Sequence, residues 1–468
     1  MAIQEDLAFA PALALAQLVA DREISPVELT ELYLTRIERL NPTLNAFITV
    51  ASDYAMDAAR TAEATLGNDL PPFHGVPIGI KDLSDTAGIR TTCGTAAWAE
   101  RVPDTDDGIV TKIKQAGFVI LGKTNTPEFG LLNITEPPAY GPCRNPWDTE
   151  RSPGGSSGGA ASGLAAGLMP VAHGSDAGGS IRVPSSVCGL YGIKPSRGRV
   201  SASPRAQSIT WQGGPIARTV ADAAAFLDAI SGYTTGDAWW APPPERPFLD
   251  EVGRDPGRLR IAFTSESTVD GIEVAPGNCA VVEDTAKLLA ELGHTVEEAA
   301  PRWDPDRMTR GPLIFAAELA ARPDMPDPQT MDPFVRALFE FGKLVQTTDY
   351  IQAVDATHRM NRELVAFFDT YDVLLTPTVG RPPPRIGELA GFDNILQAMP
   401  VLLAFTPFTD AWNVTGQPAA SLPLGTDELG LPVGAQLVGR PADEATLIRL
   451  SAQVEQARPW ADRRPPVS

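Results

Sequence analysis

The chain has 468 residues, of which 43% are hydrophobic and 21% are charged, so it can bury a substantial core. Its 58 acidic and 38 basic side chains give a formal net charge of −20 at pH 7, which argues against nucleic acid or an anionic membrane as the main partner. The 4 cysteines form no C-x-x-C pair, so neither a zinc knuckle nor a disulfide framework is indicated, and we expect reduced thiols.

No targeting or membrane-spanning segment is predicted. Acidic residues precede the first apolar run, where a secretory signal would carry basic ones. The longest uncharged stretch of apolar and small residues, 158–174, contains histidine, serine and proline and is shorter than the roughly 20 residues of a spanning helix. We therefore expect a cytoplasmic protein.

A helical arm is predicted over residues 1–65. Ser25-Pro26-Val27-Glu28 combines an N-cap serine, a first-turn proline and the glutamate of a capping box. Apolar residues then recur at helical spacing, and Asn41-Pro42 is expected to end the helix.

Residues 66–235 are predicted to form the catalytic core, since short apolar runs alternate there with glycine. Strands are expected at 75–80, 118–122 and, as a short one, 169–172, with a helix over 109–115. Strands that alternate with helices favour an α/β layered fold.

Residues 236–370 are predicted to form a variable linker and helical region. The segment 236–257 is rich in proline, glycine and acid, which is typical of a surface linker. A β-α-β segment follows, and 303–370 is expected to be mostly helical. Residues 371–468 return to the sheet, so the whole chain, 1–468, is predicted to be one domain.

Two glycine-rich runs carry the candidate chemistry. The first, 152–159, precedes a helix-like run in which Gly159, Gly163 and Gly167 would allow close packing. It lacks the lysine of a phosphate-binding loop and follows no strand as a dinucleotide fingerprint would. It satisfies G-x-S-x-G formally, but no buried strand precedes it and the downstream histidines look structural.

The second glycine-rich run, 174–180, could turn several backbone N–H groups toward one point, where they would stabilise a developing oxyanion. Ser180 closes this run and would place its hydroxyl beside a carbonyl carbon. Lys81 follows an apolar run, and burial there would lower its pKa so that the free amine could accept a proton.

Together these segments resemble the amidase signature family. The separations of 75 residues between Lys81 and Ser156, and of 24 between Ser156 and Ser180, are offsets common in that family. The likeness is strong over 70–230 and 372–450 and weak over 236–370. It is carried by 79–82, 121–130, 141–142, 144–148, 153–159, 174–184, 192–195, 413–419 and 430–439.

The resemblance implies an α/β fold with a central mixed, twisted β-sheet covered by helices on both faces. It also implies a triad in which Ser180 is the nucleophile, Ser156 the bridging serine and Lys81 the general base. The peptide bond Gly155–Ser156 would be cis. Ser157 is a rival to Ser156, which the family offset selects.

Other site residues follow from the same resemblance. Asp176 and Arg182 are expected to brace the loop, and no metal or organic cofactor is needed. The oxyanion hole would consist of the backbone N–H groups of Ala177, Gly178, Gly179 and Ser180. The acyl pocket would draw on the loop formed by Gly130, Leu131, Leu132 and Asn133.

The implied activity is hydrolysis of an amide-type carbon–nitrogen bond through an acyl-enzyme, with esterase or urethanase side activity. Apolar residues at the expected entrance favour an amide, anilide or carbamate with an aryl or alkyl group, although core packing explains many of them equally well. These residues are Leu313, Ile314, Phe315, Phe339, Phe341, Leu402, Leu403, Phe405 and Phe408.

Two alternatives remain open. The chain could be the A subunit of a glutamine-dependent tRNA amidotransferase, but 200–214 and 303–360 depart from the pattern expected there. It could also be a catalytically silent scaffold, which the intact triad positions disfavour. We expect a small-molecule amide or carbamate as partner, and a homodimer is among the open oligomeric states.

Overall fold

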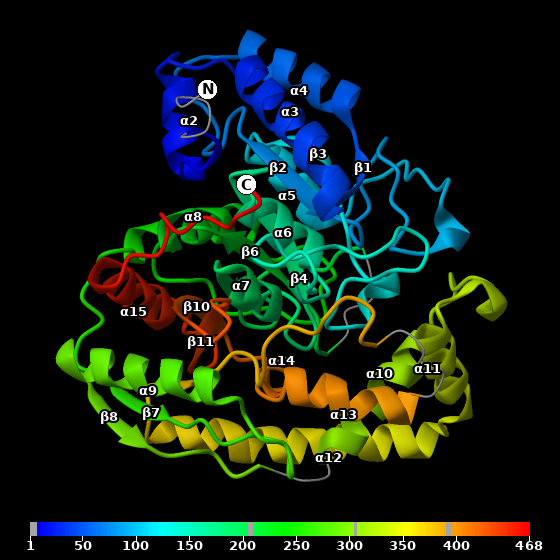
Figure 1. The fold of residues 1–468 in the computed structure, drawn as a ribbon, viewed down its shortest axis with the longest axis vertical. Coiled ribbons are helices and arrows are strands. Elements are labelled where there is room, and N and C mark those ends of the chain that lie inside the picture. Colours follow the sequence, from blue (N-terminus) through cyan, green and yellow to red (C-terminus); the bar gives the residue numbers. More distant parts are fainter. Residues whose placement is uncertain (1–6, 205–208, 304–306, 390–394) are drawn as a thin grey trace.

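A computed structural model describes residues 7–204, 209–303, 307–389 and 395–468. Within these ranges one mixed sheet of 11 strands crosses the molecule in the order β1-β3-β2-β4-β6-β5-β10-β11-β9-β7-β8 (Figure 1). The strands are β1 Phe47–Val50, β2 Pro77–Lys81, β3 Val119–Thr124, β4 Val171–Asp176, β5 Tyr191–Lys194, β6 Gln212–Ala217, β7 Arg260–Phe263, β8 Thr295–Glu298, β9 Val373–Pro377, β10 Ala419–Thr426 and β11 Pro432–Gly439.

Helices cover this sheet. The α-helices are α2 Ala12–Ala20, α3 Pro26–Leu44, α4 Ser52–Ala64, α5 Gly108–Gln115, α6 Gly158–Ala165, α7 Arg182–Cys188, α8 Val220–Ile230, α9 Pro276–Glu291, α10 Arg307–Ala320, α11 Pro333–Leu344, α12 Thr347–Ala366, α13 Ile395–Phe405, α14 Asp410–Thr415 and α15 Glu444–Ala457. Short 3-10 helices are η1 Ala96–Trp98, η2 Glu128–Gly130, η3 Leu249–Glu251, η4 Pro328–Thr330 and η5 Phe367–Asp369.

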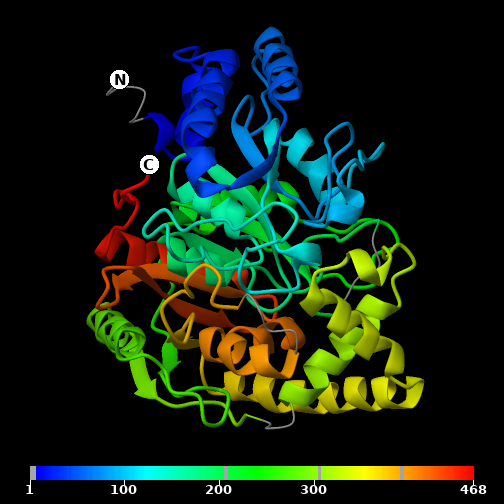
Figure 2. The same ribbon diagram turned by 45° about the vertical axis from the view of Figure 1, so that its right-hand side comes forward.

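The N-terminal helices and the helices of the variable region lie at opposite ends of the molecule. Figure 2 shows α2, α3 and α4 in blue at the top, and α12 in yellow along the bottom. Over the described ranges, no helix has both the length and the apolar character that crossing a bilayer requires.

Two parallel strands position the candidate site. β2 lies between β3 and β4 and is parallel to both, so the carboxyl ends of β2 and β4 meet at the same edge of the sheet. β4 pairs with β2 only through Val171 and Ala172, and along its whole length with antiparallel β6. Lys81 ends β2 and Asp176 ends β4, so both residues lie at this edge.

The helix predicted after Ser25 is present, with one correction at its end. Ser25 Oγ accepts a hydrogen bond from the Glu28 N–H at 3.0 Å, and Glu28 Oε2 accepts one from the Ser25 N–H at 2.9 Å, which completes the predicted capping box. The prediction that Asn41-Pro42 ends the helix is wrong, since α3 continues to Leu44. Proline removes one N–H donor but has a helical φ, and the helix ends only where Asn45 turns left-handed, at φ 50°.

The third predicted strand of the core is longer than expected. The apolar run suggested 169–172, whereas β4 runs from Val171 to Asp176. Its second half is polar and buried, and it is held by the ladder with β6, which reaches Asp176 opposite Gln212. Strand pairing, and not local hydrophobicity, therefore carries the backbone to the candidate site.

Candidate active site

Lys81 lies at the centre of a group of hydroxyl oxygens. Its side chain is fully buried. Its Nζ lies 2.8 Å from Ser156 Oγ, 2.9 Å from Ser157 Oγ and 3.1 Å from Ser175 Oγ, with the Ser175 carbonyl oxygen at 3.3 Å. The direct partners of this amine are thus neutral groups.

This environment favours the free amine. Burial lowers the pKa of Lys81 to about 7, and the negative charge of Asp176 opposes the shift. Near neutral pH a large share of the Lys81 side chains is therefore unprotonated and able to accept a proton from a hydroxyl group at hydrogen-bond distance.

The two neighbouring serines both reach the amine but differ in their other contacts. The peptide bond Gly155–Ser156 is cis. Ser157 Oγ also donates to the Ser175 carbonyl at 3.2 Å and accepts from the Ser175 N–H at 3.3 Å. These bonds commit the Ser157 hydroxyl to Ser175, which favours Ser156 as the residue that passes a proton on.

Ser180 lies in the turn between β4 and α7 and is half-buried, so part of this residue is open to solvent. Its carbonyl oxygen accepts a hydrogen bond from the Ser157 N–H at 3.3 Å. This bond joins the turn that carries Ser180 to the cis-peptide segment. The structure thus brings together the three segments that carry Lys81, Ser156 and Ser180.

Two of the histidines that follow the first glycine-rich run, His173 and His294, have structural contacts. The Lys81 backbone N–H lies 3.4 Å from His173 Nδ1, and burial lowers the pKa of His173 to about 3, so this ring is neutral. His294 accepts a hydrogen bond from the Leu259 N–H at 3.2 Å and lies 2.8 Å from Gln453 Oε1 through its other nitrogen. This agrees with the structural interpretation of His294 from the sequence.

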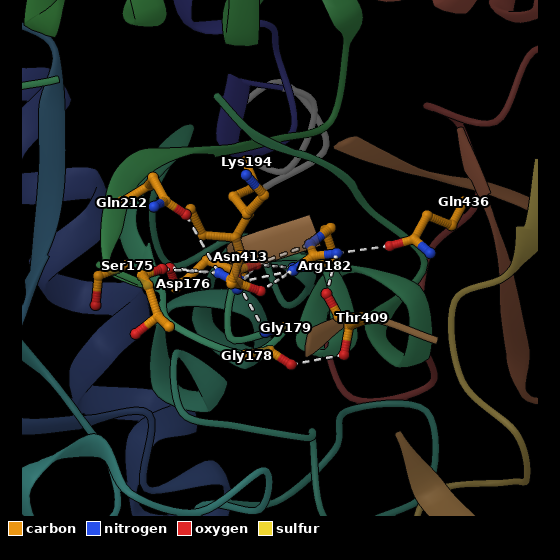
Figure 3. A network of polar contacts seen from close by, with 12 residues as sticks. Ser175, Asp176, Gly178, Gly179, Arg182, Lys194, Gln212, Thr409, Asn413 and Gln436 are labelled. Carbon is orange, nitrogen blue, oxygen red and sulfur yellow. Dashed lines mark hydrogen bonds and ion pairs between the residues drawn. The ribbon is translucent and has the colours of Figure 1, made fainter. Parts of the chain in front are cut away.

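Asp176 braces the turn that ends in Ser180 (Figure 3). Its carboxylate accepts from the backbone N–H groups of Gly179 at 2.7 Å and Ile181 at 3.1 Å. It also accepts from Arg182 Nη2 at 2.9 Å and Nε at 3.0 Å. Burial alone would raise the pKa of Asp176, but the charges of Arg182 and Lys194 and the bond from Asn413 hold it below its ordinary value.

The C-terminal part of the chain completes this network, as Figure 3 shows. Arg182 donates to Asn413 Oδ1 at 2.6 Å, to Gln436 Oε1 at 2.7 Å and to the Thr409 carbonyl at 3.0 Å. Asn413 Nδ2 donates in turn to the Asp176 carbonyl at 2.9 Å. The sequence singled out the segments of Asn413 and Gln436 without assigning contacts to them, because no local pattern shows which distant residues meet.

One of the four predicted oxyanion donors is already engaged. The N–H of Gly179 donates to Asp176, so it could serve an oxyanion only as a shared donor. Gly178 is exposed, and a Cβ built on it would meet no atom within 4 Å. The N–H groups of Ala177, Gly178 and Ser180 remain candidates for the oxyanion hole.

The predicted acyl-pocket loop divides into residues with different surroundings. Gly130 adjoins Ser156, since a Cβ built on Gly130 would lie 3.2 Å from Ser156 Oγ. Leu131 packs on an apolar cluster that also contains Phe129, and Leu132 is half-buried. Asn133 donates to Thr406 Oγ1 at 2.7 Å and so ties the loop to the segment after α13.

The apolar residues expected at the entrance also differ from one another in exposure and in packing. Phe405 and Phe408 are buried, whereas Phe341 is 45% exposed. Phe315 and Phe339 belong to the cluster around Phe129, formed by α10, α11 and the 129–131 loop. Core packing therefore accounts for part of the set, and Phe315 and Phe339 stay beside the candidate pocket.

Comparison with known proteins identifies the family of the chain. The family model named Amidase matches residues 28–448. A Mycobacterium tuberculosis protein named as an amidase, AmiB2, is 41% identical and is covered over 99% of both chains. The 6-aminohexanoate-cyclic-dimer hydrolase of Paenarthrobacter ureafaciens is 38% identical, over 97% of this chain and 96% of that one.

A solved structure of 6-aminohexanoate cyclic dimer hydrolase, complexed with substrate, superposes with a TM-score of 0.93 and 34% identity. The match covers 98% of this chain and 99% of that one. Since the family match spans most of the chain and the relatives align from end to end, the protein belongs to the amidase signature family and is a hydrolase of amide carbon–nitrogen bonds.

Proposed function

We propose that the protein hydrolyses amide, anilide or carbamate bonds in small molecules that carry an apolar aryl or alkyl group, through an acyl-enzyme on Ser180. The observation that carries this proposal is the contact of 2.8 Å between Lys81 Nζ and Ser156 Oγ inside a buried site. A neutral amine beside a serine hydroxyl is the arrangement that general-base activation of a nucleophile requires.

In the first half-reaction, Ser180 Oγ bonds to the substrate carbonyl carbon and gives its proton to Ser156 Oγ. Ser156 passes its own proton to Lys81 Nζ. Backbone N–H groups of the 177–180 turn that are not engaged by Asp176, those of Ala177, Gly178 and Ser180, stabilise the oxyanion. The carbon–nitrogen bond then breaks, and the proton held by Lys81 returns through Ser156 to the leaving nitrogen.

In the second half-reaction, a water molecule attacks the acyl carbon. Its proton follows the same route to Lys81 and is returned to Ser180 Oγ when the ester bond breaks. The acid product leaves, and all three side chains regain their starting protonation states. The sequence of steps therefore consumes one water and leaves no net proton on the protein.

The apolar substrate preference rests on the surroundings of Gly130. Leu83, Phe129 and Leu131 belong to or pack on the cluster formed with α10 and α11, next to the Gly130 position that adjoins Ser156. An apolar wall favours uncharged aryl or alkyl groups, because a charged group would lose hydration there without a partner.

Hydrolysis of a substrate panel tests the proposal. The panel contains an anilide, a primary aliphatic amide, a carbamate, an aryl ester, 6-aminohexanoate cyclic dimer and glutamine, each with wild-type protein and Ser180→Ala. We expect turnover of at least one uncharged amide or carbamate and its loss in Ser180→Ala. Turnover of glutamine alone would favour the amidotransferase alternative, and unchanged turnover by Ser180→Ala would contradict the acyl-enzyme.

A further inference from the structure

We infer that Thr409 is a positioning residue for the oxyanion loop, through the hydrogen bond from its hydroxyl group to the Gly178 carbonyl. This inference rests on the proposed function, since it assigns Thr409 a role in the reaction at Ser180. Thr409 precedes α14, more than two hundred residues after Gly178 in the chain, and Figure 3 shows the two residues joined in the network around Asp176.

The hydrogen bond between Thr409 and Gly178 is short, and its donor is buried. Thr409 Oγ1 donates to the Gly178 carbonyl oxygen at 2.6 Å, and the Thr409 side chain is fully buried. A Cβ built on Gly179 would lie 2.4 Å from Thr409 Oγ1 and 2.9 Å from its Cβ. The threonine therefore packs directly against the backbone of the loop.

This bond fixes one side of a peptide group whose other side is also held. Gly178 C=O and Gly179 N–H belong to the same peptide plane, and the Gly179 N–H donates to Asp176 Oδ1 at 2.7 Å. With both ends bonded, this plane cannot rotate freely although two glycines flank it. Its orientation sets the directions of the adjoining N–H groups of Gly178 and Ser180, which are candidate oxyanion donors.

Thr409 is itself held in place by the same network. Its carbonyl accepts from Arg182 Nη1 at 3.0 Å, and Arg182 contacts Asp176. Asn413, in the helix that begins after Thr409, donates to Asp176 Oδ1 at 2.8 Å. The Thr409 hydroxyl thus presents a fixed donor to a loop that glycine would otherwise leave free.

Replacement of Thr409 separates its hydroxyl group from its bulk. Thr409→Val keeps the shape and removes the donor, whereas Thr409→Ser keeps the donor and removes a methyl group. Thr409→Ala is a second variant without the hydroxyl, in case valine is not accommodated. Thr285→Val is the matched control, because Thr285 is a buried threonine in α9 whose hydroxyl bonds to the Val281 carbonyl at 2.7 Å.

Two constants report on the loop: kcat/KM for a hydrolysed anilide or carbamate, and Ki for a trifluoromethyl ketone with the same acyl group, which forms a tetrahedral adduct on a nucleophilic serine. We expect Thr409→Val and Thr409→Ala to lower kcat/KM and to raise Ki by the same factor, about 10-fold to 100-fold. The expected factor is smaller than the one caused by removal of a direct oxyanion donor, because Thr409 acts only through the loop. The KM of these variants should stay within about threefold of the wild-type value. Thr409→Ser and Thr285→Val should remain within about threefold of wild type in both constants.

Constants within threefold of wild type for Thr409→Val and Thr409→Ala would overturn the inference. An equal loss in Thr409→Ser would overturn it as well, since packing and not the hydroxyl would then be responsible. A fall in kcat/KM without a parallel rise in Ki would likewise contradict a role at the oxyanion. Ser180→Ala measured alongside distinguishes the two proposals: if it retains activity, the proposed function fails whatever the Thr409 variants do.

Discussion

At the scale of single residues, burial alone does not identify the base. Lys81, Lys123 and Lys194 are all buried, and burial lowers the pKa of each, that of Lys123 to about 8. Lys123 Nζ donates to Thr86 Oγ1 at 3.1 Å and to Thr91 Oγ1 at 3.0 Å. Among these three lysines, Lys81 contacts Ser156, and the Ser156–Ser157 segment is bonded to the half-buried turn of Ser180. This geometry supports Lys81 as the proposed base.

The lowered pKa of Lys81 predicts how the rate depends on pH. The amine must be unprotonated to accept a proton, so kcat/KM should rise as pH increases through about 7 and level off above it. Lys81→Ala should remove most activity, and Lys81→Arg should do the same because a guanidinium stays protonated. Initial rates between pH 5 and 9 check this; a profile that peaks below about pH 6, or wild-type rates in Lys81→Ala, would contradict it.

Gly130 provides a steric test of the pocket. It has φ +72°, and a Cβ there would lie 2.6 Å from Leu83 Cδ1 and 3.2 Å from Ser156 Oγ. Gly130→Ala should lower kcat/KM at least about tenfold, since displacement of reacting groups by a fraction of an ångström is costly. Gly253→Ala is the matched control, because Gly253 has φ +79° with no atom within 4 Å of the added Cβ. It should keep full activity; equal losses in both variants would point to backbone strain instead.

At the scale of elements, the turn between β4 and α7 depends on a buried ion pair. Arg182 Nη2 lies 2.9 Å from Asp176 Oδ1, and neither side chain is exposed. Asp176→Asn would leave the guanidinium without its counter-charge, so we expect a loss of about 3–5 kcal/mol in the free energy of unfolding and most of the activity. Asp57→Asn, in an exposed pair with Arg60, should cost less than about 1 kcal/mol.

Urea denaturation at pH 7 compares these variants. Because the pKa of Asp176 lies below its ordinary value, the contribution of its charge is complete at neutral pH and is lost only as pH falls below about 4 toward the folded value. Equal stability of Asp176→Asn and Asp57→Asn at pH 7 would contradict the importance of the buried pair.

The sequence predicts elements whose signals are local. The capping box at Ser25 marks the start of α3, and the apolar run before Lys81 predicts β2. The Gly159 position packs closely as predicted, since a Cβ there would lie 2.3 Å from the Asn125 nitrogen. The resemblance to a known family supplied the triad residues, because spacing alone left the base open.

The features of the fold and of the candidate site that the sequence does not predict depend on contacts between distant residues. β4 extends beyond its apolar half because β6 pairs with it. The contact of Thr409 with Gly178 and that of Asn413 with Asp176 each join residues more than two hundred positions apart. No periodicity or motif in either segment specifies its partner, so these contacts appear only in the folded structure.

At the scale of the whole molecule, one sheet connects all parts of the chain. β5 of the core pairs with β10, and β11 pairs with β9, which lies beside β7. Strands between residues 47 and 439 therefore belong to one hydrogen-bonded sheet. The variable region contributes α10 and α11 to the cluster around Phe129, next to the candidate pocket. We therefore expect the chain to unfold as a single unit, as the single-domain prediction states.

Calorimetry tests this cooperativity. We expect one endotherm, with coincident transitions by far-UV circular dichroism and tryptophan fluorescence. Trp412 and Trp460 are buried in different clusters, so fluorescence reports on both. Two separate transitions would show that the region 236–370 or another part unfolds independently.

In the proposed mechanism Ser180 is the nucleophile and Lys81 activates it through Ser156. Peptide mapping by mass spectrometry after reaction with a fluorophosphonate tests it most directly. We expect a phosphonyl adduct on Ser180, formed in step with the loss of activity and much more slowly in Lys81→Ala. An adduct on Ser156 or another residue, or full activity after Ser180 has been labelled, would contradict it.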